Sequence, residues 1–436
     1  MGPGSELAPR FCSIYDVSLR RVFPMRSLIR QRLVILSLLA FLLPGAKLRG
    51  DDTPPEKMFA EVPFDQWVKQ GPATALPWKV LIQQNGLSLH QRMSVHVEVQ
   101  MLRRELVKRP PDQRMLVLVE IMSAAGQPFR NYELFRMSEM EPAVKRGEID
   151  VFWDTYMLPG DYTITLALAV GDTGEHNLAQ RKLHVGPPKN DPMPGIWREL
   201  PTVEFLSSTL KGPDEMFRPD IPTRLNLPLA TQRPLQLDVL ADVTVSNLFR
   251  GSTSFYERYL EVALPLLKAL SQVSVERGSL NVAMLDLHRR EVTFEQDDVK
   301  ELDWPRARSV LAPEADTATV DIKLLAQRRE SPAFLQDELL RRLNAASADP
   351  LHVFVIIGSP MDFYSFRDLP RLPAGSEEKC VVYYLQFELL DTTYADGAVG
   401  NVRKMLKPLT VHVFKVRTAE SVRHALARIV EEVSAM

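Results

Sequence analysis

Apolar and polar residues alternate between Leu76 and Val185, and this pattern limits that part of the chain to half-buried strands. In Met93–Met101 every odd position is apolar and every even position is polar. Such a period of two places one set of side chains in a core and the other in solvent. Similar runs follow, separated by turn signals rich in Gly and Pro at 126–128 and 159–161. We therefore predict an antiparallel β-sandwich over residues 76–185.

The pattern changes in the C-terminal half, where strands that are apolar throughout alternate with helical segments. Leu235–Val245 leads into a helical stretch, and His352–Ile357 is apolar after its first residue. Strands of this kind suit a parallel sheet that is covered on both faces. We predict a doubly wound α/β domain over residues 230–436. Ten of the 33 prolines fall between residues 186 and 234, so residues 186–229 are predicted to be a proline-rich linker.

The N-terminal 50 residues are predicted to contain an export signal. Met25 is the expected start, because a basic stretch with three arginines follows it and precedes the apolar run Leu33–Leu43. Eleven residues fit the apolar part of a signal peptide and fall short of the roughly 20 that a membrane-spanning helix needs. We expect cleavage near Gly50, an exposed lead-in at 51–75, and a periplasmic or secreted protein with no integral membrane span.

Charge and cysteine content argue against nucleic-acid binding and against an intramolecular disulfide. The chain has 53 basic and 55 acidic side chains, a balance that argues against nucleic-acid binding through phosphate contacts. Without residues 1–50 the numbers become 45 and 53, a net charge of −8. The two cysteines are Cys12 and Cys380, and loss of the first leaves no intramolecular disulfide. Cys380 lies in an apolar strand pattern and is predicted to be an inert core thiol.

The segment Asp242-Val-Thr244-Val-Ser246 resembles the metal-adhesion loop of von Willebrand factor A domains. The resemblance covers residues 230–436 and extends to a hairpin expected after the first helix. It implies an Mg²⁺ ion held by Asp242, Thr244 and Ser246, with Ser331 in place of the family's threonine. The family's aspartate directly after the fourth strand has no match, because Asp362 comes about four residues late. The turn at 158–162 gives the sandwich a resemblance to immunoglobulin-like domains.

These patterns predict an exported protein of the cell envelope that binds a protein partner or acts as a scaffold. Recognition is expected through the α/β domain without a metal, and the aromatic residues Phe363, Tyr364 and Phe366 are candidates for contact with the partner. Two alternatives are Mg²⁺-dependent adhesion and an uncharacterised enzyme at the carboxyl ends of the parallel strands. The chain lacks nucleophile-elbow, phosphate-loop and zinc-protease motifs. We therefore predict no catalytic residues and no bound cofactor.

Overall fold

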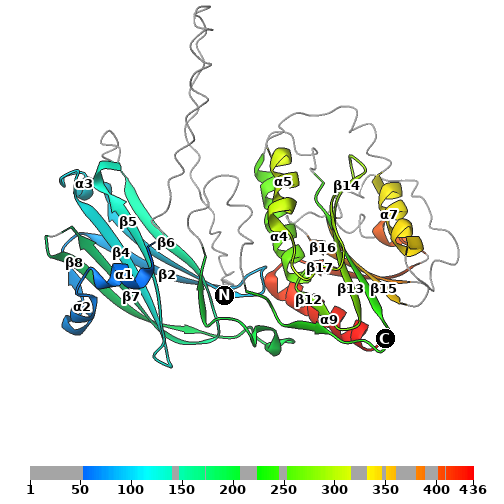
Figure 1. Ribbon diagram of the computed structural model, residues 1–436, viewed down its shortest axis with the longest axis horizontal. Helices are drawn as coiled ribbons and strands as arrows, with labels where there is room; N and C mark the ends of the chain where they lie inside the picture. Colours follow the sequence, from blue (N-terminus) through cyan, green and yellow to red (C-terminus); the bar gives the residue numbers. More distant parts are fainter. Residues whose placement is uncertain are drawn as a thin grey trace, which may run out of the picture. The chain divides into compact units, whose positions relative to one another are not determined.

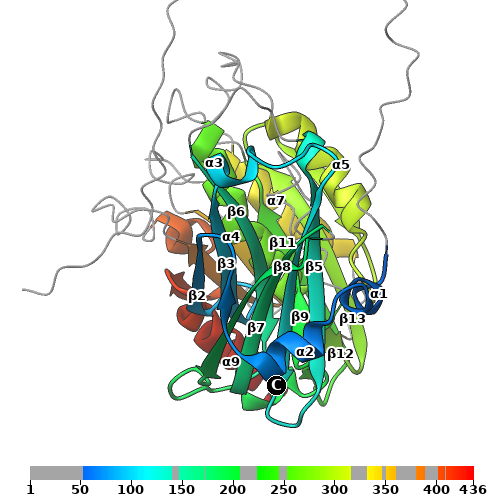
Figure 2. The same ribbon diagram turned by 90° about the vertical axis from the view of Figure 1, so that its left-hand side faces the viewer.

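In the computed structural model every described residue belongs to one compact unit, which spans residues 53–436. The structure describes residues 53–139, 147–171, 173–206, 223–244, 253–315, 331–345, 350–359, 380–387, 401–407 and 409–436. Figures 1 and 2 show two β-rich regions, one formed by β1–β9 and one by the strands that follow. Ser246, Asp362 and the three aromatic residues at 363, 364 and 366 lie outside the described residues.

The first region is built from two antiparallel sheets. One sheet has the order β1-β8-β7-β4-β5 and the other has the order β2-β3-β6-β9. The five-stranded sheet contains β1 (Ala73–Thr74), β4 (Arg114–Ser123), β5 (Pro128–Arg136), β7 (Gly160–Val170) and β8 (Glu175–Val185). The four-stranded sheet contains β2 (Trp78–Leu87), β3 (Met93–Leu102), β6 (Glu148–Met157) and β9 (Val203–Phe205). The short helix α3 (Arg103–Leu106) follows β3.

The alternation read from the sequence is confirmed in β3, whereas most residues of β4 and β7 are buried on both faces. On β3 the side chains of Val95, Val97 and Val99 are fully buried, whereas the polar residues between them are partly exposed. They share a core with the inward residues of β4 and β7, among them Val119 and Leu166. Burial of aliphatic side chains at about 25 cal/mol per Å² is the main force that holds two such sheets together.

The second region contains a six-stranded sheet with the order β14-β13-β11-β15-β16-β17. Its strands are β11 (Leu235–Asp242), β13 (Gly278–Asp286), β14 (Glu291–Gln296), β15 (Leu351–Gly358), β16 (Cys380–Phe387) and β17 (Thr410–Val416). All neighbouring pairs are parallel except β13 and β14, which form an antiparallel hairpin. A separate parallel pair joins β10 (Leu227–Leu229) and β12 (Val273–Val275). The helices are α4 (Thr253–Leu270), α5 (Trp304–Ala315), α7 (Ser331–Ala345) and α9 (Ala419–Ser434).

The two faces of the six-stranded sheet pack against different helices. On β11, Leu237 and Val239 belong to the same core as residues of α4 and α9. Leu240, which points the other way, packs with Leu335 and Leu339 of α7. Gly278 begins β13 with φ of +136°, and a Cβ atom there would lie 1.7 Å from the carbonyl oxygen of Leu235. Only glycine allows β13 to start this close to β11.

The predicted fold class, a β-sandwich followed by a doubly wound α/β domain of von Willebrand factor A type, is wrong. Strand makes up 45% of the structure and helix 27%, in four separate sheets, and the six-stranded sheet is mixed. The physical reason is that periodicity is a local property. It shows that a segment such as Val353–Ile357 is buried on both faces, but it does not set how strands are divided among sheets or in which direction they run.

Residues predicted to be a lead-in and a linker also form ordered structure. The lead-in at 51–75 contains α1 (Pro55–Ala60) and α2 (Phe64–Gln70), which pack on the outer face of the five-stranded sheet. The linker at 186–229 contains the 3₁₀ helix Pro194–Trp197 and β9, which extends the four-stranded sheet by pairing with β6. Within the described part of the chain, no helix is both long and apolar enough to cross a bilayer.

Candidate functional site

The predicted metal loop begins at the carboxyl end of β11, where two of its residues hold each other in place. Asp242 is 3% exposed, and its Oδ1 accepts hydrogen bonds from the Thr244 amide, at 3.0 Å, and from the Thr244 hydroxyl. The Thr244 hydroxyl oxygen in turn accepts a hydrogen bond from the amide of Leu287, at 2.7 Å. This chain of hydrogen bonds fixes the end of β11 to the end of β13, as polar groups in a turn commonly do.

Ser331 begins α7 and is fully buried, and its hydroxyl has no hydrogen-bond partner among the described residues. The structure places Asp242 and Thr244 together, but Ser331 does not line the cavity beside Asp242. That cavity has a volume of about 10 Å³ and a mostly apolar lining: Asp242, Leu285, Leu287, Leu335, Ile356, Gly358 and Tyr384. It is at the lower limit of the volume that a single water molecule needs.

These residues do not fit a hydrated magnesium ion. Mg²⁺ requires near-octahedral oxygen coordination and keeps several of its water molecules, whereas this cavity is bounded chiefly by leucine and isoleucine side chains. The cavity is also tight beside Gly358, where even an added Cβ atom would lie 3.1 Å from the Tyr384 hydroxyl. Nowhere in the described ranges do three or more His, Cys, Asp or Glu side chains come together in a way that could hold a metal.

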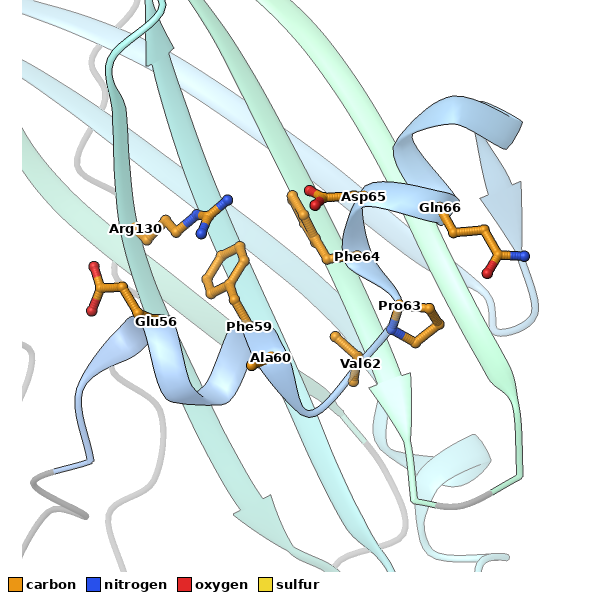
Figure 3. Close-up of a pocket in the computed structure, with 9 residues that line it drawn as sticks. All are labelled: Glu56, Phe59, Ala60, Val62, Pro63, Phe64, Asp65, Gln66 and Arg130. Carbon is orange, nitrogen blue, oxygen red and sulfur yellow. The ribbon is translucent and has the colours of Figure 1, made fainter.

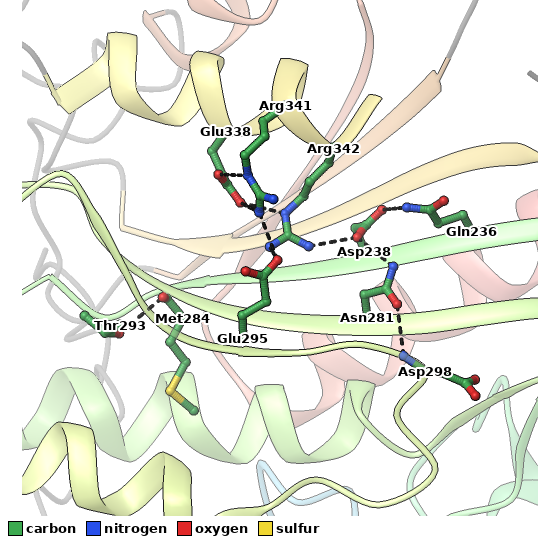
Figure 4. A network of polar contacts seen from close by, with 10 residues as sticks. All are labelled: Gln236, Asp238, Asn281, Met284, Thr293, Glu295, Asp298, Glu338, Arg341 and Arg342. Carbon is green, nitrogen blue, oxygen red and sulfur yellow. Dashed lines mark hydrogen bonds and ion pairs between the residues drawn. The ribbon is translucent and has the colours of Figure 1, made fainter. Parts of the chain in front are cut away.

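A second polar cluster lies between β11 and α7 and is shown in Figure 4. The guanidinium group of Arg342 donates to Asp238 at 3.0 Å, to Glu338 at 2.7 Å and to Glu295 at 2.6 Å. Arg341 donates to Glu338 and Glu295 as well. The side chains of Arg342, Asp238 and Glu338 are each at most 4% exposed. We call these five residues the α7 ion network; its buried members are paired with one another, as buried charges require.

Cys380 agrees with its predicted role as a core thiol. The side chain is 4% exposed, and burial raises the pKa of the thiol to about 12. A thiol is nucleophilic only as a thiolate, which this environment disfavours strongly at neutral pH.

A hollow with a partly apolar lining lies on the outer face of the five-stranded sheet, between α1, α2 and β5. It has a volume of about 300 Å³ (Figure 3). Its lining, which we call the α1–α2 groove, consists of Glu56, Phe59, Ala60, Val62, Pro63, Phe64, Asp65, Gln66 and Arg130. This volume is at the lower end of the range for ligand pockets.

Apolar anchors hold the two short helices that form the α1–α2 groove. Phe59 and Phe64 meet edge to face with ring centroids 4.7 Å apart, and both pack on the outward residues of β4 and β7. Trp67 stacks on His176 of β8 at 4.4 Å. Pro55 stands in the first turn of α1, where its missing amide hydrogen costs no hydrogen bond. Gly71, with φ of +90°, ends α2.

Arg130 is the cationic group of the α1–α2 groove, and its position is fixed from two sides. Its Nε donates to Glu120, its cross-strand neighbour on β4, at 2.8 Å. Its guanidinium group lies over the ring of Phe59, 4.7 Å from the centroid. Within the described ranges the two terminal nitrogens of Arg130 make no hydrogen bond. Figure 3 shows this group among the aromatic side chains of α1 and α2.

Two exposed carboxylates flank the groove, on Glu56 of α1 and Asp65 of α2. Neither carboxylate makes an ion pair or a side-chain hydrogen bond to any described residue. The α1–α2 groove therefore presents unused donors and unused acceptors beside an apolar floor. The arrangement supplies no pair of groups poised for proton transfer or nucleophilic attack, but it can bind a ligand that carries both polar and apolar groups.

Sequence reasoning missed this groove, although part of its signal was present. Met58, Phe59, Phe64 and Trp67 are apolar residues at helix-compatible spacing in a segment that was assigned as exposed. Arg130, in contrast, is far from this segment in sequence and lies on a strand with no motif. The pairing of β5 with β4 brings Arg130 to the groove.

Comparisons with known proteins give no family for this chain. No family model matches the sequence, and no curated protein matches it.

Among solved structures, a mutant of the PilB minor pilin from Streptococcus sanguinis is 7% identical, with a TM-score of 0.24 over 72% of this chain and 87% of that one. A putative ApaA protein from Bordetella pertussis is 11% identical, with a TM-score of 0.18 over 27% of this chain and 99% of the other. A glycosyl hydrolase family 2 member from Bacteroides cellulosilyticus is 8% identical, with a TM-score of 0.18 over 78% of this chain and 44% of the other. Likenesses this low support no argument about fold or function.

Proposed function

We propose that this chain is an exported binding protein of the cell envelope, and that it recognises a protein partner through the α1–α2 groove. The observation that carries the proposal is the hydrogen-bonding capacity of Arg130, Glu56 and Asp65 that no described residue uses, around a hollow of about 300 Å³. Sites of recognition combine an apolar floor with a few polar groups that fix orientation. The N-terminal apolar run Leu33–Leu43 supports export.

The carboxyl ends of the parallel strands are a weaker candidate for function. Asp242 and Thr244 are both buried and joined to each other, and the cavity beside them holds about 10 Å³. Among the described residues, this cavity leaves no room for a substrate or a partner's carboxylate. For this reason we favour binding at the groove over both Mg²⁺-dependent adhesion and catalysis at the strand ends.

Site-specific photo-crosslinking in intact cells tests this proposal. A photoreactive amino acid replaces Gln66, an exposed residue of the groove, and the matched control places it at Arg181, an exposed residue of β8 outside the groove. We expect a discrete protein adduct from position 66 that Arg130→Gln weakens, and none from position 181. The proposal fails if position 66 gives no adduct, or if the adduct is indifferent to the state of Arg130.

A further inference from the structure

We infer that the partner of the α1–α2 groove is an extended peptide segment that places a Lys or Arg side chain next to an apolar side chain. This inference rests on the proposed function and specifies its ligand class. Three features of the groove carry it: its charge balance, the kind of hydrogen-bonding group that each polar side chain offers, and the apolar surface between them.

The charge balance of the groove favours a cationic group. The positive charge of Arg130 is already balanced by Glu120, whose side chain is 9% exposed and 2.8 Å away. Glu56 and Asp65 have no such counter-ion among the described residues. The site as a whole is therefore acidic, and a ligand with an ammonium or guanidinium group would neutralise it.

The groove contains both hydrogen-bond donors and acceptors, and this mixture argues against a free anion or a small free cation as its ligand. A free anion would meet the terminal nitrogens of Arg130 but would also face two carboxylates, and a small free cation would leave those nitrogens unused. A peptide segment offers both kinds of partner. Its backbone carbonyl oxygens accept from Arg130, and a basic side chain donates to Glu56 or Asp65.

The apolar lining adds a place for the neighbouring side chain of the same segment. Val62 and Pro63 form the turn between α1 and α2, and with Phe59 and Phe64 they make up the apolar part of the groove. Figure 3 shows Val62 and Pro63 on the turn, and the ring of Phe59 beside Arg130. An aliphatic residue beside the basic one would remove this surface from water.

Fluorescence anisotropy with three labelled pentapeptides tests the ligand class on the full chain. The peptides are capped at both ends and share the frame Gly-Leu-X-Leu-Gly, with Lys, Gln or Glu at X. We expect the Lys peptide to bind most tightly and its affinity to fall as salt rises. Glu56→Gln and Asp65→Asn should each weaken it about two- to fivefold, and Arg130→Gln should weaken all binding about tenfold. Glu61→Gln, an exposed neutralisation just outside the groove, is the matched control and should change nothing.

The outcomes separate this inference from the proposed function. Tighter binding of the Glu peptide, or equal binding of the Gln and Lys peptides, overturns the ligand class. If no peptide binds while the adduct from position 66 persists, the ligand class is wrong and the proposed function stands. If a neutral oligosaccharide present during irradiation prevents formation of that adduct and the Lys peptide does not, the groove binds carbohydrate instead. Loss of the adduct itself overturns the proposed function.

Discussion

The α7 ion network and the α1–α2 groove both centre on an arginine, yet the two arginines differ in burial and in how much of their donor capacity is used. The side chain of Arg342 is 4% exposed and donates to three carboxylates. The side chain of Arg130 is 26% exposed and donates only through Nε within the described residues. Charge alone therefore does not distinguish a structural site from a recognition site; unused hydrogen-bonding groups at an accessible position do.

The two arginines differ in how many of their hydrogen-bond donors are used inside the protein. Every contact of Arg342 is satisfied inside the protein, so the network fixes α7 against β11 and has nothing left to offer a partner. Asp238 of β11 also accepts from Asn281 of β13 at 3.1 Å, which ties a third element into the network. Among the described residues, Arg130 in the groove is oriented by Glu120 and Phe59 alone.

Arg342→Met should lower the free energy of unfolding by about 3–5 kcal/mol, because it leaves the buried carboxylate of Asp238 without a counter-charge and leaves Glu338 with Arg341 alone. Arg341→Met is the matched control. The Arg341 side chain is 51% exposed, so its loss should cost about 1 kcal/mol or less. Urea denaturation of both variants measures the difference. Equal losses would show that burial does not set the strength of this network.

Thr244→Val should lower the free energy of unfolding by about 1–3 kcal/mol, since it removes the buried hydroxyl that joins Asp242 to the Leu287 amide. The wild-type protein should unfold at the same temperature with and without millimolar Mg²⁺. A thermal shift with Mg²⁺ that Thr244→Val abolishes would contradict this account and restore the metal-dependent adhesion site.

Acid should destabilise the α7 ion network through Glu338. Burial tends to raise the pKa of this carboxyl, but hydrogen bonds and charge from Arg341 and Arg342 outweigh it and hold the pKa below its ordinary value of 4.5. A lowered pKa in the folded state contributes stability above about pH 4.5 that is lost as the pH falls through the folded-state pKa. We therefore expect the free energy of unfolding, measured from about pH 6 down to about pH 3, to fall more steeply for wild type than for Glu338→Gln. Parallel curves would contradict the assignment.

Arg130→Gln should change stability least, by about 1 kcal/mol or less, because the pair with Glu120 is partly exposed and glutamine still offers a donor. Its effect should instead be on recognition at the α1–α2 groove. Thermal unfolding and the anisotropy assay, run on the same preparation, separate the two quantities. A loss of several kcal/mol without any change in binding would make Arg130 a structural residue like Arg342.

Local patterns in the sequence were enough to predict individual strands but not how they assemble. The alternation at Met93–Met101 identified β3, and the apolar run at His352–Ile357 identified β15. The assignment of the fold class failed because strand partition and direction depend on long-range pairing. The link between Asp238 and Arg342 spans 104 residues, and no spacing rule points to it.

The candidate site was harder to predict than the strands. The metal-loop motif directed attention to Asp242 and Thr244, which the structure brings together, but their polar groups serve the turn between β11 and β13. The groove depends on α1 and α2 lying against the five-stranded sheet, and on the cross-strand pairing that sets Arg130 beside Glu120. A motif reports which residue types are present; whether their hydrogen bonds are already used is known only from the fold.

The central claim is that recognition occurs at the α1–α2 groove and not at the carboxyl ends of the parallel strands. Photo-crosslinking from Gln66 in the groove and from Arg290, an exposed residue in the turn after β13, compares the two places directly in the same cells. Our account predicts a protein adduct from position 66 and none from position 290. An adduct from position 290 alone would contradict it and place recognition at the strand ends.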